Sequence, residues 1–407
     1  MRINVKTINV FSLGCLIALI FIPLLSRYLR VITFYPLLLL WGLSAFLIDN
    51  RHAPLRRSGA DFLIYVCLLY LAAYAFTGSS GYLRRILTYI IISYSSLLMY
   101  AFYERHPEMI DRHKWFVYFC LVVGLFTTIP GLLQYPMASR ILATNEAIYA
   151  GQQAQFKAMG IGGYEYIYTL VIFVIFSPNA LRVAKRKRLY WFIALAMLVC
   201  IFLAGYTIAI LLSLSMTLIS FVVSRRRRQF VLKILIIAFL SILIWSFREP
   251  ILLAIADFAD SQNVYYVSTR IRELLYAEEF GEFSSLERIV LYQNSIRNFL
   301  GSPLVGVLSR RPMLYKSGHS EILFYIETFG MLGIPYIGFL YSTFKRYAKG
   351  VTDMGLRSCL VCCQVFFFIF AAVNRTDVAY PLMWSVFFVI PFLTRSFERE
   401  LKAEEAI

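Results

Sequence analysis

Long apolar stretches separated by short polar loops recur along the whole chain. Twelve of them approach the length needed to cross about 30 Å of hydrocarbon; they are residues 8–25, 29–48, 62–77, 86–103, 116–133, 161–176, 190–205, 206–224, 230–247, 319–344, 359–374 and 378–394. Runs such as 234–240 are apolar at every position, which excludes the alternating pattern of a membrane β-barrel. The pattern therefore predicts an all-α polytopic membrane protein with about twelve transmembrane helices.

Composition supports this class. The 407 residues are 60% hydrophobic and 17% aromatic, and the mean hydropathy is +0.68, which excludes a soluble globule with a polar surface. No small-residue cleavage site follows the first stretch, so we expect an uncleaved first helix rather than a signal peptide.

Lysine and arginine are distributed unevenly between alternate short loops. With the N-terminus inside, the cytoplasmic segments hold 24 of these residues and the opposite short loops hold 7. Positive charge is retained on the cytoplasmic side, so both termini are predicted to be cytoplasmic. The chain then divides into transmembrane helices 1–9 (1–247), one large periplasmic loop with short amphipathic helices (248–318), and transmembrane helices 10–12 with a cytoplasmic tail (319–407).

The net charge of +17 follows largely from these loops. The block Arg225–Arg228 lies between two apolar stretches, where it acts as a topology anchor facing anionic lipid headgroups of the bilayer. No nucleic-acid partner is predicted.

Several motifs are missing from the sequence. It contains no G-x-x-x-x-G-K-[ST] loop, no H-E-x-x-H and no Asp-x-Asp pair, so no metal and no cofactor is predicted, and an ATP-driven pump or a nucleotide-sugar transferase is disfavoured. All seven cysteines lie in apolar stretches and predict no disulfide framework.

One histidine stands apart from the other three. His52, His106 and His113 fall in predicted cytoplasmic loops, whereas His319 lies in Gly318-His319-Ser320, where the long loop meets the tenth stretch. A histidine at such an interface is either a helix cap or, with a pKa near neutrality, a catalytic base.

The long loop is rich in arginine although it is predicted to lie on the periplasmic side, where positive charge does not set the orientation of the helices. Its guanidinium groups are planar forks suited to phosphate oxygens. Ser284-Ser285-Leu286-Glu287 predicts a capping box that opens a helix on the membrane surface or against the bundle. In a continuous helix Arg288 and Arg297 are half a turn out of phase, so only one of them can face a given cavity.

Polar residues in or near the apolar stretches are further candidates. His319, Leu323 and Glu327 share a helical face, and Gly330 and Gly333 permit close helix approach. Glu327 either serves function or pairs with an arginine of another helix. Tyr164 and the amide side chains of 134–160 are suited to sugar contacts or simply to solvation.

Four segments carry a resemblance to a known family. They are 284–288 (Ser-Ser-Leu-Glu-Arg), 299–306 (Phe-Leu-Gly-Ser-Pro-Leu-Val-Gly), 318–320 and 327–333 (Glu-Thr-Phe-Gly-Met-Leu-Gly). Together with the twelve-span layout they resemble the signature region of bacterial O-antigen polymerases (Wzy type) and the related O-antigen ligases. The matching segments lie within a region of about 50 residues.

The resemblance implies an inner-membrane glycosyltransferase, which polymerises O-antigen, capsular or exopolysaccharide at the periplasmic face. It would transfer the growing glycan from undecaprenyl pyrophosphate to a lipid-linked repeat unit with inversion and without a metal, and it would work with a chain-length regulator. His319 would be the base and Arg288 the first choice for the diphosphate. The further substrate-binding candidates are Arg270, Arg272, Arg140, Arg297, Tyr164 and Glu327.

Two alternatives remain open at this point. A ligase would move the glycan to a lipid acceptor, but Gly205-Tyr206-Thr207 lacks the arginine that ligases often carry there, and Ser320 stands where asparagine is common. A flippase or transporter would be expected to show interrupted helices and internal repeats, and the two halves of the sequence show no convincing similarity.

Overall fold

The computed structural model describes residues 4–26, 31–49, 60–109, 111, 113–143, 147–183, 187–223, 248–261, 268–269, 271–272, 283–309, 320–376 and 379–405. Within these ranges the regular structure is helical and contains no strand. The predicted all-α class is therefore confirmed for the part of the chain that is described.

The longer helices of the N-terminal part are α1 (Val5–Phe21), α3 (Val31–Ile48), α5 (Ala60–Thr77), α7 (Ile91–Tyr103), α8 (His113–Gln134), α11 (Tyr164–Val183), α12 (Lys187–Ala204) and α13 (Thr207–Val223). Those of the C-terminal part are α15 (Arg248–Ser261), α17 (Phe283–Gly301), α18 (Glu321–Phe329), α19 (Pro335–Lys349), α20 (Met354–Val373) and α22 (Ile390–Glu405). Short helices connect them: α2 (Pro23–Ser26), α6 (Ser80–Arg85), η1 (Ile86–Ile90), η2 (Pro107–Met109), α9 (Ala138–Ala143), η3 (Ala147–Tyr149), α10 (Ala150–Ala158), η5 (Gly306–Ser309), η6 (Gly330–Gly333), α21 (Tyr380–Trp384) and η7 (Ser385–Val389).

Two helical segments form the centre of the bundle. Residues 166–177 of α11 and 381–394 of α21, η7 and α22 are buried at every position, and α11 contacts α12, α13, α20 and α21. A helix that is apolar all round is expected to be surrounded by other helices, so the continuous apolar runs of the sequence correspond to the innermost elements.

The outer helices expose large apolar side chains. Leu39, Leu47, Phe126, Trp191 and Phe192 are each more than half exposed, and several lie one or two turns apart on the same helix. Such surfaces are stable in hydrocarbon but not in water.

Helix length gives the same result. Four helices in the described ranges are long and apolar enough to cross a membrane, namely Ser80–Tyr103, His113–Gln134, Lys187–Ala204 and Met354–Val373, and five shorter apolar helices accompany them. The fold is that of a helical membrane protein. Of the twelve predicted stretches, 230–247 lies outside the described residues.

The tenth predicted stretch is not one continuous helix. Residues 319–344 were expected to form a single span, but α18 and η6 meet α19 at a bend of 101°. Gly330 ends α18 with φ +60°, a conformation that favours glycine. Pro335 is the first residue of α19, a position where proline is common. The stretch is thus a broken span or a re-entrant loop, and Gly330 and Gly333 serve the turn rather than a flat helix interface.

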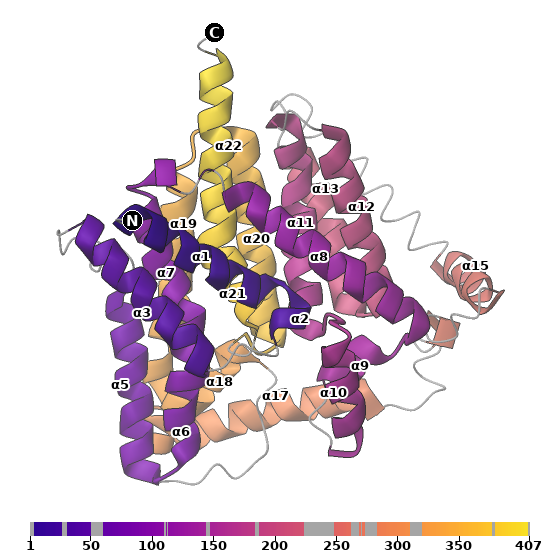
Figure 1. Ribbon diagram of the computed structural model, residues 1–407. Coiled ribbons are helices and arrows are strands. Elements are labelled where there is room, and N and C mark those ends of the chain that lie inside the picture. Colours follow the sequence, from indigo (N-terminus) through magenta and orange to yellow (C-terminus); the bar gives the residue numbers. More distant parts are fainter. Residues whose placement is uncertain are drawn as a thin grey trace.

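The loop helices and the C-terminal helix mark opposite ends of the bundle. Figure 1 shows α17 running across the end where α9 and α10 also lie, while α22 projects from the other end. The helix predicted after the capping box is confirmed as α17, although it begins at Phe283 and so includes Ser284 and Ser285 in its first turn.

Candidate functional site

The C-terminal end of α20 gathers polar contacts from several distant segments. We call residues 370–376 the α20 corner. Here α20 ends at Val373, because Asn374 adopts extended backbone, and three carbonyl groups of the corner then accept hydrogen bonds from other elements. The corner lies at the same end of the bundle as α17 (Figure 1).

The start of α18 is fixed to this corner. Ser320 caps α18 by accepting the Leu323 N–H at 3.1 Å, and its hydroxyl lies 3.4 Å from the Ala371 carbonyl oxygen. The Glu321 N–H donates to the Asn374 carbonyl at 3.1 Å. The residue that follows His319 in the sequence is therefore held at the α20 corner, whereas His319 itself lies outside the described residues.

Glu321 is a buried carboxylate that sequence reasoning missed. Its side chain is 2% exposed, accepts the Thr376 N–H at 3.2 Å and lies 3.8 Å from the Arg375 Nε. A carboxylate this deeply buried requires such partners. The sequence gives one hint of its partners, the polar run that begins at Asn374 directly after an apolar stretch.

α17 reaches the same corner. The Tyr292 hydroxyl donates to the Val373 carbonyl at 2.9 Å, and Arg288 precedes Tyr292 by four residues, about one helical turn. The α17 helix is continuous from 283 to 301. Arg288 and Arg297 are therefore attached on opposite sides of this helix, as the sequence predicted. Arg297 has an exposed side chain, and the side chain of Arg288 lies outside the described residues.

Aromatic rings cover the other side of the corner. Phe370 lies 4.5 Å from Tyr168 and 5.8 Å from Tyr164 between ring centroids, and Tyr206 packs against both tyrosines at 5.8 and 5.6 Å. Tyr164 and Tyr206 are half-buried. Aromatic faces with hydroxyl tips of this kind suit the apolar faces and hydroxyl groups of sugars.

Arg140 joins this aromatic group from α9. Its Nη2 donates to the Gly205 carbonyl at 2.7 Å, and its guanidinium carbon lies 5.6 Å from the Tyr206 ring centroid. The structure thus brings together two predicted residues, Arg140 and Tyr164, through Tyr206. It also supplies a guanidinium at the start of α13, the place where the sequence itself lacks an arginine.

Two arginines that the sequence did not single out lie over one ring. The guanidinium carbons of Arg85 and Arg375 are 4.4 and 4.3 Å from the centroid of Phe324, one turn into α18. Glu327 follows further along α18 and is 2% exposed, so it belongs to the buried face of that helix. Its pairing with an arginine of another helix remains a prediction.

Of the remaining loop candidates, Arg272 pairs with carboxylates of α15. Arg272 lies 3.0 Å from Asp257 and 2.8 Å from Asp260 of α15, so its charge is balanced locally. Arg270 lies outside the described residues.

Two of the segments that carry the family resemblance, 299–306 and 327–333, pack on each other. A Cβ on Gly330 would lie 2.5 Å from the Pro303 carbonyl oxygen, and one on Gly306 would lie 2.2 Å from the Thr328 carbonyl oxygen. The Met331 N–H donates to the same Pro303 carbonyl at 2.8 Å. The turn after α17 and the bend after α18 therefore form one close backbone contact.

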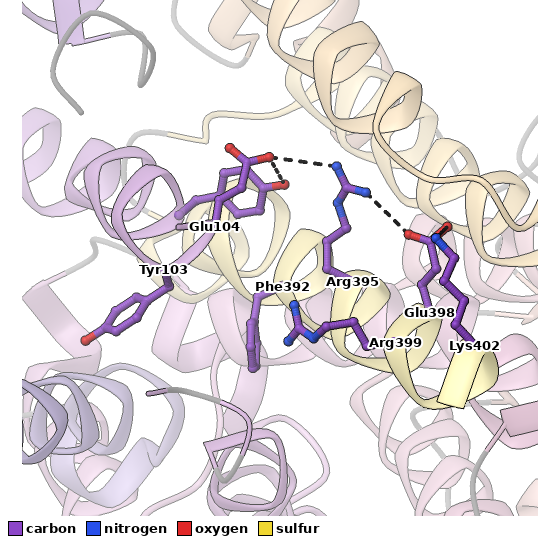
Figure 2. Close-up of a pocket in the computed structure, with 8 residues that line it drawn as sticks. Tyr103, Glu104, Phe392, Arg395, Glu398, Arg399 and Lys402 are labelled. Carbon is purple, nitrogen blue, oxygen red and sulfur yellow. Dashed lines mark hydrogen bonds and ion pairs between the residues drawn. The ribbon is translucent and has the colours of Figure 1, made fainter. Parts of the chain in front are cut away.

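A second polar cluster lies at the end from which α22 projects. A pocket of about 250 Å³ (Figure 2) is lined by Tyr100, Tyr103, Glu104, Phe392, Arg395, Glu398, Arg399 and Lys402. Arg395 lies 3.8 Å from Glu104 and 3.3 Å from Glu398, and Arg399 lies 2.5 Å from Asp111. Its arginines are each paired with a carboxylate, which makes this cluster a structural link rather than an anion site.

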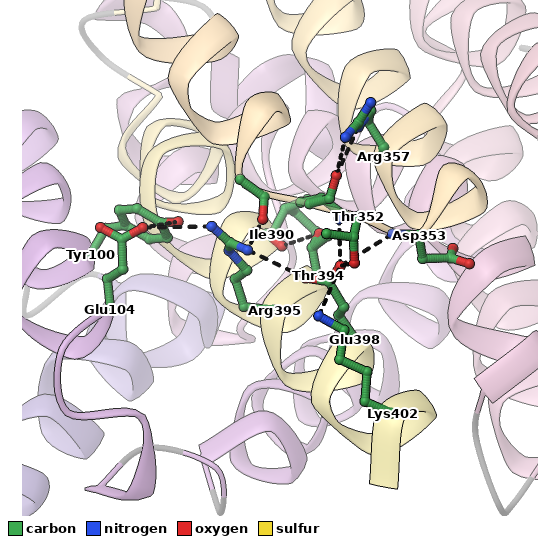
Figure 3. Close-up of polar contacts among 12 residues, drawn as sticks. Tyr100, Glu104, Thr352, Asp353, Arg357, Ile390, Thr394, Arg395, Glu398 and Lys402 are labelled. Atoms are coloured by element: carbon green, nitrogen blue, oxygen red, sulfur yellow. Dashed lines mark hydrogen bonds and ion pairs between the residues drawn. The ribbon is translucent and has the colours of Figure 1, made fainter. Parts of the chain in front are cut away.

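Glu398 is the centre of that link. Figure 3 shows it beside Thr352, Asp353, Arg395 and Lys402. Burial acts to raise the pKa of Glu398, but hydrogen bonds from the Thr352 hydroxyl and N–H and the Asp353 N–H, together with the Lys402 charge, outweigh it and hold the pKa below its usual range.

The lowered pKa predicts an acid-sensitive contribution to stability. A carboxylate with a depressed folded-state pKa stabilises the fold above its unfolded pKa and loses this contribution as pH falls through the folded value. We expect Glu398→Gln to destabilise the protein by about 1–3 kcal/mol at pH 7, and the difference from wild type to shrink below about pH 4. Melting temperatures in detergent from pH 3 to 8 measure this, with the exposed Glu108→Gln as control; a difference independent of pH would contradict it.

Comparison with known proteins adds no family. No protein-family model and no curated protein sequence matches this chain.

Proposed function

We propose that this protein is an inner-membrane polysaccharide polymerase of about twelve spans with both termini in the cytoplasm and the α20 corner at the periplasmic face. It would transfer a growing glycan from undecaprenyl pyrophosphate to a lipid-linked repeat unit. The observation that supports this is the convergence on the α20 corner of α17, the start of α18 and the Arg140–Tyr164–Tyr206 group. These elements contain or adjoin most of the residues that the sequence singled out.

The chemistry needs a base and an electrostatic clamp. In the proposed step the acceptor hydroxyl oxygen forms a bond to the anomeric carbon, the bond from that carbon to the diphosphate oxygen breaks, and undecaprenyl pyrophosphate leaves with the electron pair. His319 takes the hydroxyl proton and later releases it to water. Arginine side chains stabilise the charge that develops on the diphosphate, and attack from the opposite face inverts the anomeric centre.

The residues at the corner suit these roles. His319 directly precedes Ser320, which is fixed to Ala371, so a base there would lie beside the corner. Arg288 belongs to the helix that Tyr292 fixes to Val373. The half-buried rings of Tyr164 and Tyr206 offer faces on which sugar rings can stack.

Glycan laddering in a polymerase-deficient host tests the proposal. We expect wild type to restore a ladder, and His319→Ala and Arg288→Ala to leave only single repeats at normal protein levels. The exposed Lys157 of α10 supplies the control, because Lys157→Ala removes a cation without touching the corner. Full ladders from both site variants would overturn the assignment of base and clamp.

Two other functions have one supporting observation each. The guanidinium of Arg140 at the start of α13 fits a ligase, which would attach glycan to a lipid acceptor in a ligase-deficient host. The bend between α18 and α19 fits a transporter with a broken helix. Loss of lipid-linked repeats from the outer face in the absence of this protein would favour the transporter.

A further inference from the structure

The end of α17 and the turn that follows it expose large apolar side chains. Leu300, at the end of α17, is 67% exposed, and Leu304, in the turn of residues 302–305, is 66% exposed. Met331 and Ile334, at the bend between α18 and α19, are exposed as well. Exposed apolar patches mark surfaces that a membrane or another protein covers.

The neighbouring helix α5 fixes the depth of this surface in the bundle. The Tyr65 hydroxyl donates to the Leu332 carbonyl of η6 at 2.5 Å, and the Phe62 ring stacks on that of Phe339 in α19 at 3.9 Å between centroids. Tyr65 precedes Thr77, the last residue of α5, by about 18 Å of helix. The bend therefore lies well within the length of α5 and not at its end.

The 302–305 turn lies against this bend. The Met331 N–H donates to the Pro303 carbonyl at 2.8 Å, and a Cβ on Gly330 would lie 2.7 Å from the Leu304 carbonyl carbon. The next element along the chain, η5, contacts α5 itself. In Figure 1 the end of α5 beside α6 lies farther out than α17, so the turn is set back from that end.

α5 presents an apolar face beside the turn. Ile64, Leu68 and Leu71 are exposed and follow one another at about one helical turn. Tyr65, which donates to η6, directly follows Ile64 in this helix. The exposed side chains of the bend and of the 302–305 turn therefore extend the apolar face of an outer helix.

The backbone of the turn is suited to hydrocarbon. Irregular backbone at membrane depth is tolerated only where protein satisfies its polar groups. The Gly306 N–H donates to the Ser302 carbonyl at 3.0 Å, the Ser302 hydroxyl donates to the Gly306 carbonyl at 3.0 Å, and proline at 303 has no N–H. These polar groups are thus paired within the turn, while Leu304 is left exposed.

We propose that the end of α17 and the 302–305 turn are immersed in the outer leaflet of the bilayer, with Leu300 and Leu304 in contact with acyl chains. Lipid is the partner because this surface continues the exposed face of α5 at the depth of Tyr65. Part of the segment predicted to be a periplasmic loop is then a membrane element. The inference requires α5 to cross the bilayer and does not depend on the proposed enzymatic activity.

Nitroxide accessibility in proteoliposomes tests this placement. Replacing Leu304 by p-acetylphenylalanine gives a ketone for attachment of the label, so the seven native cysteines stay unchanged. Labels at the exposed Leu68 of α5 and Gln152 of α10 are the lipid and water controls. We expect a nickel chelate to relax the labels at 304 and 68 about tenfold less than the label at 152, because a polar solute is costly to transfer into hydrocarbon. Oxygen should relax the label at 304 as strongly as the label at 68.

The control sites define the contrary results. Nickel relaxation at 304 equal to that at 152 would place the turn in water and overturn the proposal. Weak relaxation at 304 by both reagents would show that protein, such as a second copy, covers the turn and would also overturn it. Nickel relaxation at 68 equal to that at 152 would remove the premise that α5 borders lipid. If the protein labelled at 304 aggregates, the same label at Leu300, one turn earlier, decides by the same criteria.

The accessibility result is separate from the polymerase result. A label in water at 304, in a protein that restores the glycan ladder, would retain the polymerase and overturn the immersion. A label in lipid at 304, in a protein that restores no ladder, would retain the immersion and count against the polymerase.

Discussion

Replacing Gly330 by alanine is expected to remove most of the folded, active protein. Gly330 has φ +60° and ψ −138°, a conformation almost restricted to glycine, which costs a residue with a Cβ of the order of 1–3 kcal/mol. The added Cβ would also lie 2.5 Å from the Pro303 carbonyl oxygen and 2.7 Å from the Leu304 carbonyl carbon. Since both are backbone atoms, the turn after α17 would have to shift.

Stability and activity of this variant are measured together. The melting temperature in detergent and the glycan ladder at matched expression should both fall sharply. Gly338→Ala is the matched control, because Gly338 lies in α19 with no atom within 4 Å of an added Cβ and alanine favours helix. A Gly330→Ala protein with wild-type melting temperature would show that the bend is not fixed by this residue.

Glu321→Gln is expected to reduce chain extension at least tenfold, which corresponds to about 1.4 kcal/mol in the rate-limiting step. The amide keeps the size of the side chain and can still accept the Thr376 N–H. It removes the charge beside the half-buried Arg375, and the loss of this partner costs about 1–3 kcal/mol. The Arg375 fork would then lose its orientation at the α20 corner.

A double variant separates positioning from folding. Glu321→Gln with Arg375→Gln removes both charges, so the melting temperature should recover relative to Glu321→Gln alone. The glycan ladder should stay short, because the α20 corner has lost the guanidinium of Arg375. Recovery of the ladder together with the melting temperature would show that Glu321 and Arg375 contribute only to stability.

The hydrophobic pattern predicted the helices well, because helices that face lipid and helices that face other helices are both built from apolar residues. The stretches 116–133 and 359–374 correspond to α8 and α20 with small differences at their ends. The pattern did not distinguish lipid-facing α12 from the central α11, since both are apolar on nearly every side.

The bend at Gly330 was not predicted because two effects of glycine are indistinguishable in the sequence. Gly330 and Gly333 in an apolar stretch fit both close helix packing and a change of direction. Only the contact with Pro303, a residue 27 positions earlier, selects the second. That contact is long-range, and no local pattern encodes it.

The candidate site was found in part. Tyr164 and Arg140 were singled out as substrate-binding candidates, and they meet through Tyr206. Arg85 and Arg375 were counted only as loop charges, because their relation to Phe324 depends on how α6 and α20 pack around α18. The roles of His319, Arg288 and Arg270 remain predictions.

The α20 corner has a consequence for biogenesis. It combines Tyr164, Tyr292, Ser320 and Arg375, which leave the ribosome far apart in time. Early helices can insert and pack during synthesis, but the corner is complete only when about nine-tenths of the chain has been made. A nascent or truncated protein that ends before α20 therefore occupies the membrane without this corner.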